Sequence, residues 1–385
     1  MATTRGQSAP AKPGDHGELP GQVVLVLQGG GALGAFQVGV YQAMHEAGIE
    51  PDWVIGTSIG AINGAIIAGN RVEHRLERLT AFWETVRTDA PGSNRWWPGA
   101  GSAMLNLGIF MHGVPGFFAP NPQVWWGLHA PLGVEQASYY DTAALRTTLV
   151  GLVDFERLKT RQVRLSLGAV GVAHGKMRYF DSRDTELGLD HIMASGALPP
   201  AFPAVRIDGE PYWDGGIYSN TPVEAVLDDN PRRDSVIFAV QMWNPSGPEP
   251  ESLLQVLGRQ KEIQYASRAE SHLRRQDQIH RLRHVIRELT RRLPDKARDD
   301  PHTRELESFG CATRMHLVNL LAPRIEGEDL NRDIDFTSAG VRARREAGYA
   351  ATRRVIEQQP WRREGAPLDG IIVHDAVPEV SPRAG

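Results

Sequence analysis

The chain has 385 residues, which is long for a single small core, so we expect one large domain with an appendage or two domains. Its net charge of -4 is too balanced for a protein that binds nucleic acid through its whole surface. The single cysteine excludes an internal disulfide and most cysteine-based metal sites, and no cofactor is implied.

The first twenty residues contain Pro, Gly, Ser and Lys but lack the apolar core of a signal peptide. We therefore expect residues 1–20 to form a disordered tail. No stretch approaches the roughly 18 apolar residues that a membrane-spanning helix needs. These features favour a cytoplasmic protein, which would meet a lipid substrate at the membrane surface from the water side.

The N-terminal part repeats one pattern of a strand, a glycine-rich turn and a helix. The pattern occurs first over residues 23–47, where a short apolar run rich in valine predicts a buried parallel strand, and again over residues 53–68. Such a repeat indicates an α/β fold with a mostly parallel sheet. Later segments predict helices at 71–87, 141–150, 190–196, 252–293 and 338–357, and strands at 163–170, 179–181, 212–214, 235–242 and 314–321.

Residues 89–138 mix proline, glycine and the pairs Trp96-Trp97, Phe117-Phe118 and Trp125-Trp126 without a clear period. Two interpretations stay open for this aromatic-rich insertion. It is either a lid or membrane-contacting flap, since Trp and Phe favour the interface, or an insertion that packs its aromatic side chains on the core.

Ser58 stands in the run Gly-Thr-Ser-Ile-Gly between the second predicted strand and the helix after it. A serine hydroxyl is a poor nucleophile unless it is exposed, oriented and provided with a base. A sharp strand-to-helix turn exposes it, and Gly56 and Gly60 relieve clashes in such a turn. The motif also occurs as a plain turn, but the flanking strand and helix favour a nucleophile.

Three consecutive glycines, Gly29, Gly30 and Gly31, follow the first predicted strand. Besides a plain tight turn, two functions fit them. Gly29, Gly31 and Gly34 match the spacing of a dinucleotide-binding loop, but Asp52, the acidic residue at about the right distance, precedes its strand, and no Walker lysine is present. The loop can instead aim N–H groups at the oxygen of a tetrahedral intermediate, as an oxyanion hole. The serine turn that follows favours the oxyanion hole.

A base for the serine has two candidates. Asp214, followed by Gly215 and Gly216, ends a predicted strand and would take the hydroxyl proton directly, although an Asp-Gly pair is more often only a turn. A triad would need a histidine, and only His374, after an apolar run, has a suitable context. The other late histidines are His272, His280 and His284, which we expect to be solvated, and His316, which we expect in the core.

Four motifs in order resemble the patatin-like phospholipases, of the bacterial type with a C-terminal extension. They are Gly-Gly-Gly-Ala-Leu-Gly at 29–34, Gly-Thr-Ser-Ile-Gly at 56–60, Ala-Ser-Gly-Ala-Leu-Pro-Pro-Ala-Phe-Pro at 194–203 and Asp-Gly-Gly at 214–216. The resemblance covers roughly residues 21–245. It implies a three-layer α/β/α fold and a serine–aspartate dyad without histidine. Ser58 would be the nucleophile, Asp214 the base, and the backbone of Gly29, Gly30 and Gly31 the oxyanion hole.

The chain departs from the family where Leu33 replaces a usual Arg or Lys, which puts a role in phosphate recognition in doubt. We expect a catalytic domain at 21–245 and a mainly helical extension at 246–385 that packs on it. The basic run at 259–298 fits either a solvated face, whose arginines pair with local acids or with a partner subunit in a homo-oligomer, or a helix that docks on anionic lipid.

The sequence therefore predicts a serine acyl hydrolase that cleaves lipid or other acyl esters through Ser58, Asp214 and an acyl-enzyme. Two alternatives are a Ser-Asp-His esterase or thioesterase on another ester, and a nucleotide-binding module that uses the glycine loop.

Overall fold

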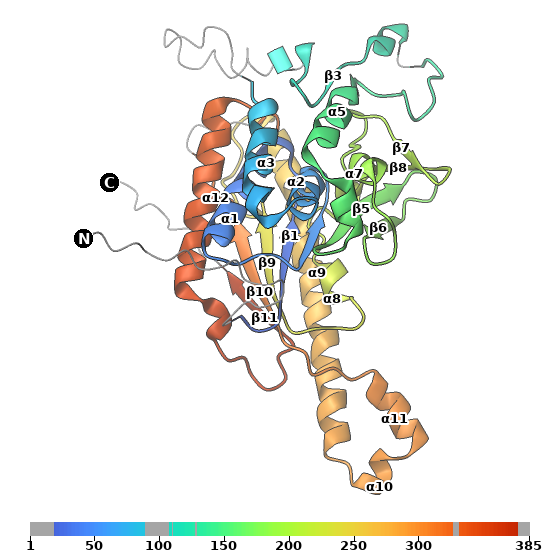
Figure 1. Cartoon of the computed structure of the whole chain (residues 1–385), viewed down its shortest axis with the longest axis vertical. Helices are drawn as coiled ribbons and strands as arrows, with labels where there is room; N and C mark the ends of the chain where they lie inside the picture. The colour runs from blue at the N-terminus through green and yellow to red at the C-terminus, as the bar shows by residue number, and fades with distance from the viewer. Residues whose placement is uncertain (1–18, 89–107, 110, 128, 326–330, 376–385) are drawn as a thin grey trace, which may run out of the picture.

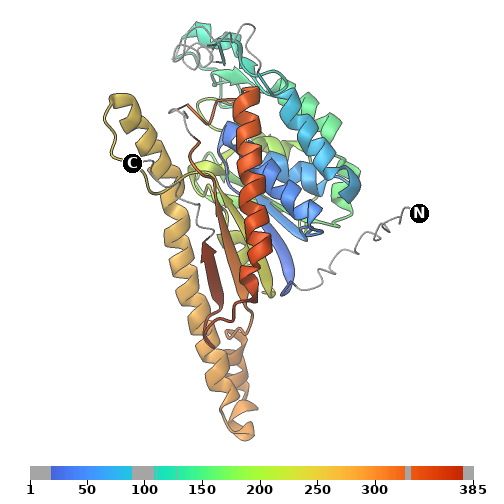
Figure 2. The same cartoon turned by 90° about the vertical axis from the view of Figure 1, so that its left-hand side faces the viewer.

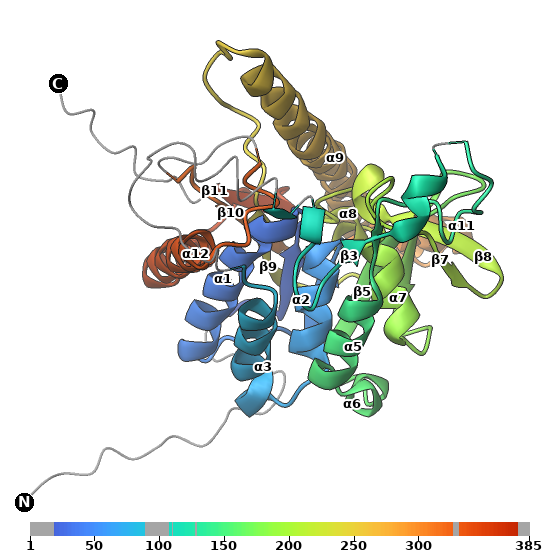
Figure 3. The ribbon, with the colours of Figure 1, turned by 90° about the horizontal axis from the view of Figure 1, so that it is seen from above.

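A nine-stranded sheet forms the middle layer of the computed structural model, which describes residues 19–88, 108–109, 111–127, 129–325 and 331–375. Helices cover both of its faces (Figures 1 and 3), so the expected three-layer α/β/α fold is confirmed. Residues 1–18 of the tail predicted at 1–20 lie outside the described residues, as does the pair Trp96-Trp97.

Strand order places the first two strands near the centre of the sheet. The order is β11-β10-β9-β1-β2-β5-β8-β7, with β6 paired to β5. Pairings from β11 through to β5 are parallel, whereas β6, β7 and β8 pair antiparallel. The strands of the sheet are β1 (Gln22–Leu27), β2 (Trp53–Gly56), β5 (Arg164–Gly171), β6 (Met177–Asp181), β7 (Val205–Ile207), β8 (Glu210–Asp214), β9 (Ser235–Gln241), β10 (Met315–Leu321) and β11 (Ile371–Asp375).

The continuous apolar run of β1 is explained by burial on both faces. Val23, Leu25 and Leu27 belong to the larger core under one helical layer, while Val24 and Val26 belong to a smaller core under the other. The helices of the described chain are α1 (Ala35–Glu46), α2 (Ile59–Ala68), α3 (Val72–Thr85), α5 (Ala143–Leu152), α6 (Phe155–Lys159), α7 (Leu189–Ser195), α8 (Glu224–Leu227), α9 (Leu253–Arg291), α10 (Asp295–Arg298), α11 (Pro301–Ser308) and α12 (Ser338–Gln358). None of them combines the length and apolar character that crossing a bilayer requires.

We expected the segment after residue 245 to be mainly helical and to pack on the catalytic domain. The structure shows that it also contributes strands to the central sheet. It supplies β10 and β11, which extend the parallel sheet beyond β9. Its last helix, α12, lies along α1, where Arg345 donates to Gln42 at 2.9 Å and Tyr349 donates to Glu46 at 2.6 Å. The division expected at residue 245 is therefore no boundary between two cores, because both segments share one sheet.

Helix α9 crosses the second face of the sheet and continues past its edge to α10 and α11 (Figure 2). The prediction that its histidines are solvated is wrong for His280 and His284, which are buried. His280 Nε2 lies 3.0 Å from the carbonyl of Leu227, and His284 Nε2 lies 2.8 Å from that of Thr313. One face of this charged helix packs on the sheet. The many charged residues in its sequence therefore did not show that these histidines are exposed to solvent.

Part of the aromatic insertion lies within the described residues. The short hairpin β3 (Ala119–Pro120) and β4 (Tyr140–Asp141) holds it, with a 3-10 turn at Pro122–Trp126 between the strands. Phe117 and Phe118 pack in the main core, which fits the packing interpretation for that pair. Trp125 and Trp126 are 86% and 72% exposed, so the packing interpretation does not extend to them, and for this pair the lid or membrane-contacting flap stays a prediction.

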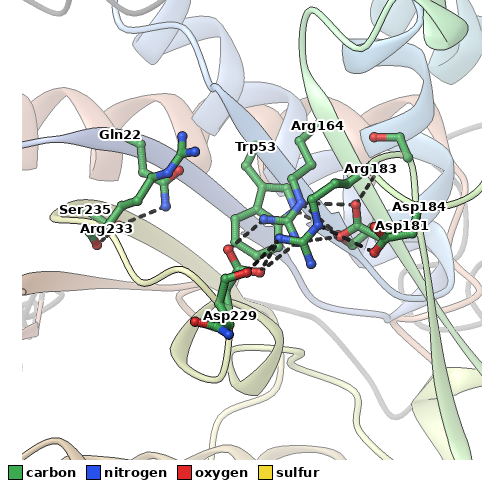
Figure 4. A network of polar contacts seen from close by, with 12 residues as sticks. Gln22, Trp53, Arg164, Asp181, Arg183, Asp184, Asp229, Arg233 and Ser235 are labelled. Atoms are coloured by element: carbon green, nitrogen blue, oxygen red, sulfur yellow. Dashed lines mark hydrogen bonds and ion pairs between the residues drawn. The ribbon is translucent and has the colours of Figure 1, made fainter. Parts of the chain in front are cut away.

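An ion-pair network holds the end of β2 that is remote from Ser58 (Figure 4). Arg164 donates to Asp181 at 2.9 Å and to Asp229 at 2.8 Å, and its guanidinium lies 3.5 Å from the centre of the Trp53 ring. The Trp53 indole donates to Ser166 at 2.8 Å. These contacts join β2, β5 and β6 to the loop after α8.

Replacing Arg164 by alanine should lower the free energy of unfolding by about 3 kcal/mol, because two largely buried carboxylates lose their shared partner. Urea unfolding monitored by circular dichroism measures the effect. Arg183→Ala is the matched control, since Arg183 also pairs with Asp229 but is more exposed, and we expect a loss below about 1 kcal/mol. Equal losses in the two variants would contradict the role given to Arg164.

Candidate active site

Ser58 occupies a strained turn between β2 and α2. Its backbone φ of 58° is positive, which is rare for residues other than glycine. The turn places the Ser58 side chain at the wall of a cavity. A Cβ on Gly56 would stand 2.5 Å from the carbonyl carbon of Gly60, and one on Gly60 would stand 2.7 Å from that of Leu27. Glycine is thus required at residue 56 because the start of α2 lies close to it, and at residue 60 because α2 packs closely on the end of β1.

The N–H of Ser58 is engaged by the residues after β6. It donates to the carbonyl of Ser195 at 3.0 Å, and the Ser195 hydroxyl donates to the carbonyl of Gly168 at 2.6 Å. The turn is therefore tied to α7 and β5. Ser195 lies in one of the quoted motifs, but sequence reasoning gave it no role.

Asp214 ends β8 and meets Ser58 at the cavity. The side chain is only 1% exposed, and its Oδ1 accepts a hydrogen bond from the N–H of Gly216 at 2.7 Å. The Ser58 hydroxyl is near enough to influence its ionisation. Oδ2 nevertheless has no partner of strict hydrogen-bond geometry among the described residues. Hydrogen bonds between catalytic groups are often poorly aligned before substrate binds, so this oxygen stays a candidate acceptor for the Ser58 hydroxyl.

Burial sets the ionisation of Asp214. Loss of solvation raises the pKa of this carboxyl to about 7, against the smaller lowering effects of the Ser58 hydroxyl and the Gly216 N–H. A carboxylate with a pKa near neutrality holds a proton more strongly than an exposed aspartate does. This property suits a group that must accept a hydroxyl proton and then return it.

The glycine loop offers fewer N–H donors than the sequence suggested. The N–H of Gly29 donates to the carbonyl of Asn220 at 3.2 Å, so it is already engaged. The structure gives no hydrogen-bond partner among the described residues for the N–H groups of Gly30 and Gly31, which line the same cavity as Ser58. The prediction of an oxyanion hole is thereby narrowed to these two glycines.

Polar side chains that the sequence did not single out hold the glycine loop. The carbonyl of Gly29 accepts from the Asn220 amide at 3.1 Å and from the Trp243 indole at 2.8 Å. The Gln28 side chain accepts from the N–H of Trp243 at 3.1 Å and donates to Thr221 at 2.6 Å. Because these groups are buried and paired, they hold the loop in one position.

A second buried chain of hydrogen bonds continues beneath the loop. Gln37 donates to the carbonyl of Gln28 at 2.7 Å, Asn63 donates to Gln37 at 2.8 Å, and the Trp83 indole donates to Asn63 at 3.1 Å. This chain joins α1, α2 and α3 under the nucleophile turn. In the sequence, the sign of these hydrogen bonds was that Gln37 and Asn63 are polar residues within predicted helices that are otherwise largely apolar.

The cavity that holds Ser58 and Asp214 is mainly apolar and has a volume of about 300 Å³. Its apolar wall is formed by Ile59, Ile62, Ile109, Phe117, Phe118, Leu198, Ala201, Phe202, Ile334 and Phe336, with Tyr140, Trp243 and Tyr265 beside them. A hollow of this composition would accept a hydrocarbon chain next to the serine.

His374 is too far from the site for a triad. It lies in β11, which is separated from β2 by four strand spacings of about 4.8 Å, or about 19 Å. Its Nε2 instead lies 3.0 Å from Nδ1 of His316, in two stacked rings. The predicted histidine alternative is therefore wrong, and none of the described histidines lines the cavity.

The nucleotide-binding alternative also fails on geometry. Asp52 accepts a hydrogen bond from the N–H of Val23 at 2.9 Å, at the start of β1. The glycine loop follows the opposite end of that strand, so this carboxylate cannot reach a ribose bound at the loop.

Comparison with known families agrees with these motifs. The profile of a family described as patatin-like phospholipase matches residues 25–227, which is more than half of the chain. The chain belongs to the patatin-like phospholipase family. A second profile, described as patatin phospholipase, matches residues 263–368. The resemblance drawn from four short motifs, with its C-terminal extension, is confirmed.

Similar proteins of this family match over short segments. Patatin-like phospholipase domain-containing protein 6 of Mus musculus is 44% identical over 66 residues, 17% of this chain and 5% of that protein. Lysophospholipase nte1 of Aspergillus terreus is 63% identical over 46 residues, 12% of this chain and 3% of that protein. Among solved structures, VipD from Legionella pneumophila aligns with 92% of this chain and 72% of its own, at 16% identity and a TM-score of 0.40.

Proposed function

We propose that this protein is a lipid acyl hydrolase of the phospholipase A type that works through Ser58 and Asp214. The observation that carries the proposal is their meeting in one apolar cavity, beside the N–H groups of Gly30 and Gly31, which have no hydrogen-bond partner in the part of the chain that the structure describes. Membership of the patatin-like phospholipases supports it.

The chemistry follows from these groups. Asp214 accepts the hydroxyl proton while Ser58 Oγ attacks the ester carbonyl, and the oxygen that becomes negative is stabilised by the N–H groups of Gly30 and Gly31. When the bond to the leaving alcohol breaks, Asp214 returns the proton to the alcohol. The same carboxylate then takes a proton from water as the water attacks the acyl-enzyme carbonyl. When the bond to Ser58 Oγ breaks, Asp214 returns this proton to Oγ, so the fatty acid leaves and the serine hydroxyl is restored.

The acyl specificity of this reaction rests on the cavity wall. An apolar pocket binds a hydrocarbon chain by removing it from water, at about 0.8 kcal/mol per CH₂. A lipid ester would therefore place its chain in this cavity, with its carbonyl at Ser58.

A panel of lipids tests the proposal. The purified full chain is incubated with phospholipids, lysophospholipids, acylglycerols and acyl thioesters, and released fatty acid is measured, with the Ser58→Ala protein as the blank. Release of fatty acid above the blank from at least one lipid is the expected result. Activity that is equal in the blank and the wild type would overturn the proposal.

The exposed pair Trp125 and Trp126 supports peripheral contact with lipid surfaces. Asn121 fixes their turn by accepting from the N–H of Gln123 at 3.0 Å and donating to the carbonyl of Ser138 at 2.9 Å. The hairpin that carries the turn also supplies Tyr140 to the cavity wall. Figure 1 shows β3 at the end of the molecule opposite α10 and α11. Since indoles favour the membrane interface, this turn would rest on the aggregate that presents the substrate.

Replacing Trp125 and Trp126 together by alanine should reduce hydrolysis of vesicle lipid about tenfold, because interfacial binding is lost. Hydrolysis of a soluble short-chain nitrophenyl ester should stay within about twofold, since neither indole lines the cavity. Sedimentation with phosphatidylcholine vesicles measures binding directly. Unchanged sedimentation would contradict the membrane role.

A homo-oligomer also stays a prediction. The hairpin formed by α9, α10 and α11 projects from the body (Figure 1) and exposes Leu282, Leu289 and Phe309. Analytical ultracentrifugation of the full chain would test it.

A further inference from the structure

The glycine loop is held on both flanks by residues that are far away in the sequence. On one flank, the Trp243 indole donates to the carbonyl of Gly29 at 2.8 Å. On the other flank, the N–H of Ala32 donates to the carbonyl of Asp333 at 2.7 Å. Ala32 lies in the first turn of a short 3-10 helix, Gly31–Gly34, where N–H groups have no acceptor within the helix. The N–H groups of the proposed oxyanion hole therefore lie between two anchors from the second half of the chain.

The backbone of Asp333 lies directly against Gly31. A Cβ on Gly31 would overlap the carbonyl oxygen of Asp333, and the φ of Gly31 is 55°, which favours glycine. The segment that carries Asp333 is itself fixed, because the Arg344 guanidinium donates to the carbonyl of Asp335 at 2.7 Å and Phe336 is buried in the main core. Since the two backbones are in contact, a shift of Asp333 would change the position of Gly31.

Lys261 on α9 contacts both anchors of the loop. Its ammonium lies 2.5 Å from the Asp333 carboxylate and 5.7 Å from the centre of the Trp243 ring. The Asp333 side chain is only 16% exposed, so this ion pair is partly shielded from water and is stronger than one on an open surface. Lys261 and Asp333 also line the cavity that holds Ser58. One side chain of the C-terminal half thus links the two groups that hold the glycine loop.

We propose that Lys261 and Asp333 are positioning residues that fix the direction of the Gly30 and Gly31 N–H groups, so that the C-terminal half completes the oxyanion hole. They act through the glycine loop rather than on the substrate, and their role rests on the proposed function. Glycine has the largest backbone freedom of any residue, whereas an oxyanion needs donors at about 2.7–3.1 Å. Because a displacement of about 1 Å can cost about 100-fold in rate, the two anchors govern turnover.

Kinetics on a soluble nitrophenyl ester test this role. Lys261→Met and Asp333→Ala should each lower kcat about tenfold and leave KM within about twofold, because the oxyanion hole stabilises the transition state more than the bound ester. The measured kcat is divided by the number of serines that a fluorophosphonate labels at completion. This correction removes any loss of folded protein, which is the only effect that a purely structural pair would have.

An alkyl boronic acid measures the oxyanion hole directly. Ser58 Oγ bonds to its boron, and one oxygen of the tetrahedral adduct occupies the position of the oxyanion. The inhibition constant should therefore rise in Lys261→Met and Asp333→Ala by about the factor by which kcat falls. The double variant should lose about tenfold rather than about 100-fold, because two residues that act as one pair do not have additive effects.

Two further variants serve as controls. Lys261→Arg keeps the charge that pairs with Asp333 and should restore kcat to within about threefold of the wild type. Arg281→Met also breaks an ion pair of α9, since Arg281 lies 3.2 Å from Asp369, but neither residue lines the catalytic cavity. At 1.5 Å per residue, Arg281 is about 30 Å further along the helix than Lys261. This variant should leave kcat and the boronate inhibition constant within about twofold.

The outcomes separate the positioning role from the proposed function. If kcat per labelled site is unchanged in Lys261→Met and Asp333→Ala, or falls without a change in boronate inhibition, the positioning role is overturned while hydrolysis stands. A rise in KM alone would also overturn it, because the two residues would then act on ground-state binding. If the wild type hydrolyses no ester and the fluorophosphonate does not label Ser58, the proposed function fails and the positioning role with it.

Discussion

Replacing Ser58 by alanine is expected to abolish ester hydrolysis, with a fall in kcat of about 10⁵-fold or more, as for other serine nucleophiles. Alanine keeps a Cβ and leaves the backbone contacts of the turn in place, so the fold should persist despite the positive φ. What is lost is the only hydroxyl that the turn presents beside Asp214. Release of nitrophenol from a soluble ester and labelling by a fluorophosphonate probe both measure this loss.

Ser308→Ala is the matched control, because it removes an exposed hydroxyl on α11. It should leave hydrolysis and labelling unchanged. A circular dichroism spectrum that is the same in both variants separates lost chemistry from lost folding. If Ser58→Ala retained labelling, another nucleophile would be reacting and the assignment of Ser58 would be wrong.

The sequence predicted most elements of the sheet because its central strands are buried on both faces. The runs 23–27 and 236–240 are apolar throughout, and the glycine turns between strand and helix mark where the chain reverses. Ser58 and Asp214 were identified from short motifs and from the family resemblance. The residues between Ser58 and Asp214 do not reveal that the two side chains lie close together. Their proximity depends on β2 and β8 both pairing with β5.

The supports of the site could not be predicted, because they depend on contacts between distant segments. Asn220 and Trp243 bond to the carbonyl of Gly29, but neither side chain differs in its sequence context from an ordinary loop residue. The engagement of the Gly29 N–H likewise depends on a carbonyl 191 residues away. Sequence reasoning therefore identified the three-glycine loop but could not tell which of its N–H groups lack a hydrogen-bond partner among the described residues.

The C-terminal half shows the same limit at a larger scale. A strand was predicted at 314–321, where the structure has β10, but its pairing with β9 was not predicted. Strand register between segments 80 residues apart leaves no local pattern in the sequence. The charged sequence of α9 concealed the face with which His280 and His284 pack on the sheet. The cations Arg259 and Lys261 of its first turns line a hollow beside the catalytic cavity, and the sequence does not show this placement.

Replacing Asp214 by asparagine is expected to lower kcat about 10²–10⁴-fold, because the amide cannot accept the proton of Ser58. The amide oxygen can still accept from the Gly216 N–H, so the turn should keep its shape. The control is His374→Ala, which should leave kcat within about twofold, since this ring lies four strands away. Steady-state kinetics on a soluble ester measures both. If His374→Ala abolished turnover while Asp214→Asn did not, the dyad would be wrong.

The pH dependence gives Asp214 a signature that a purely structural residue would lack. With a pKa of about 7, the carboxylate becomes available as a base only as the pH rises through neutrality, so kcat/KM of the wild type should rise with one proton lost near pH 7.

The free energy of unfolding should fall as the pH rises, opposite to the rise in kcat/KM. Because burial raises the folded-state pKa above the unfolded value, the native state is favoured while Asp214 is protonated, and this contribution is lost as the pH rises through about 7. At pH 8 the buried charge should cost up to about 4 kcal/mol. Asparagine carries no such charge, so Asp214→Asn should unfold at higher urea than the wild type at pH 8, with the difference shrinking toward pH 5. An inactive variant whose stability follows that of the wild type at every pH would contradict the buried, titrating base.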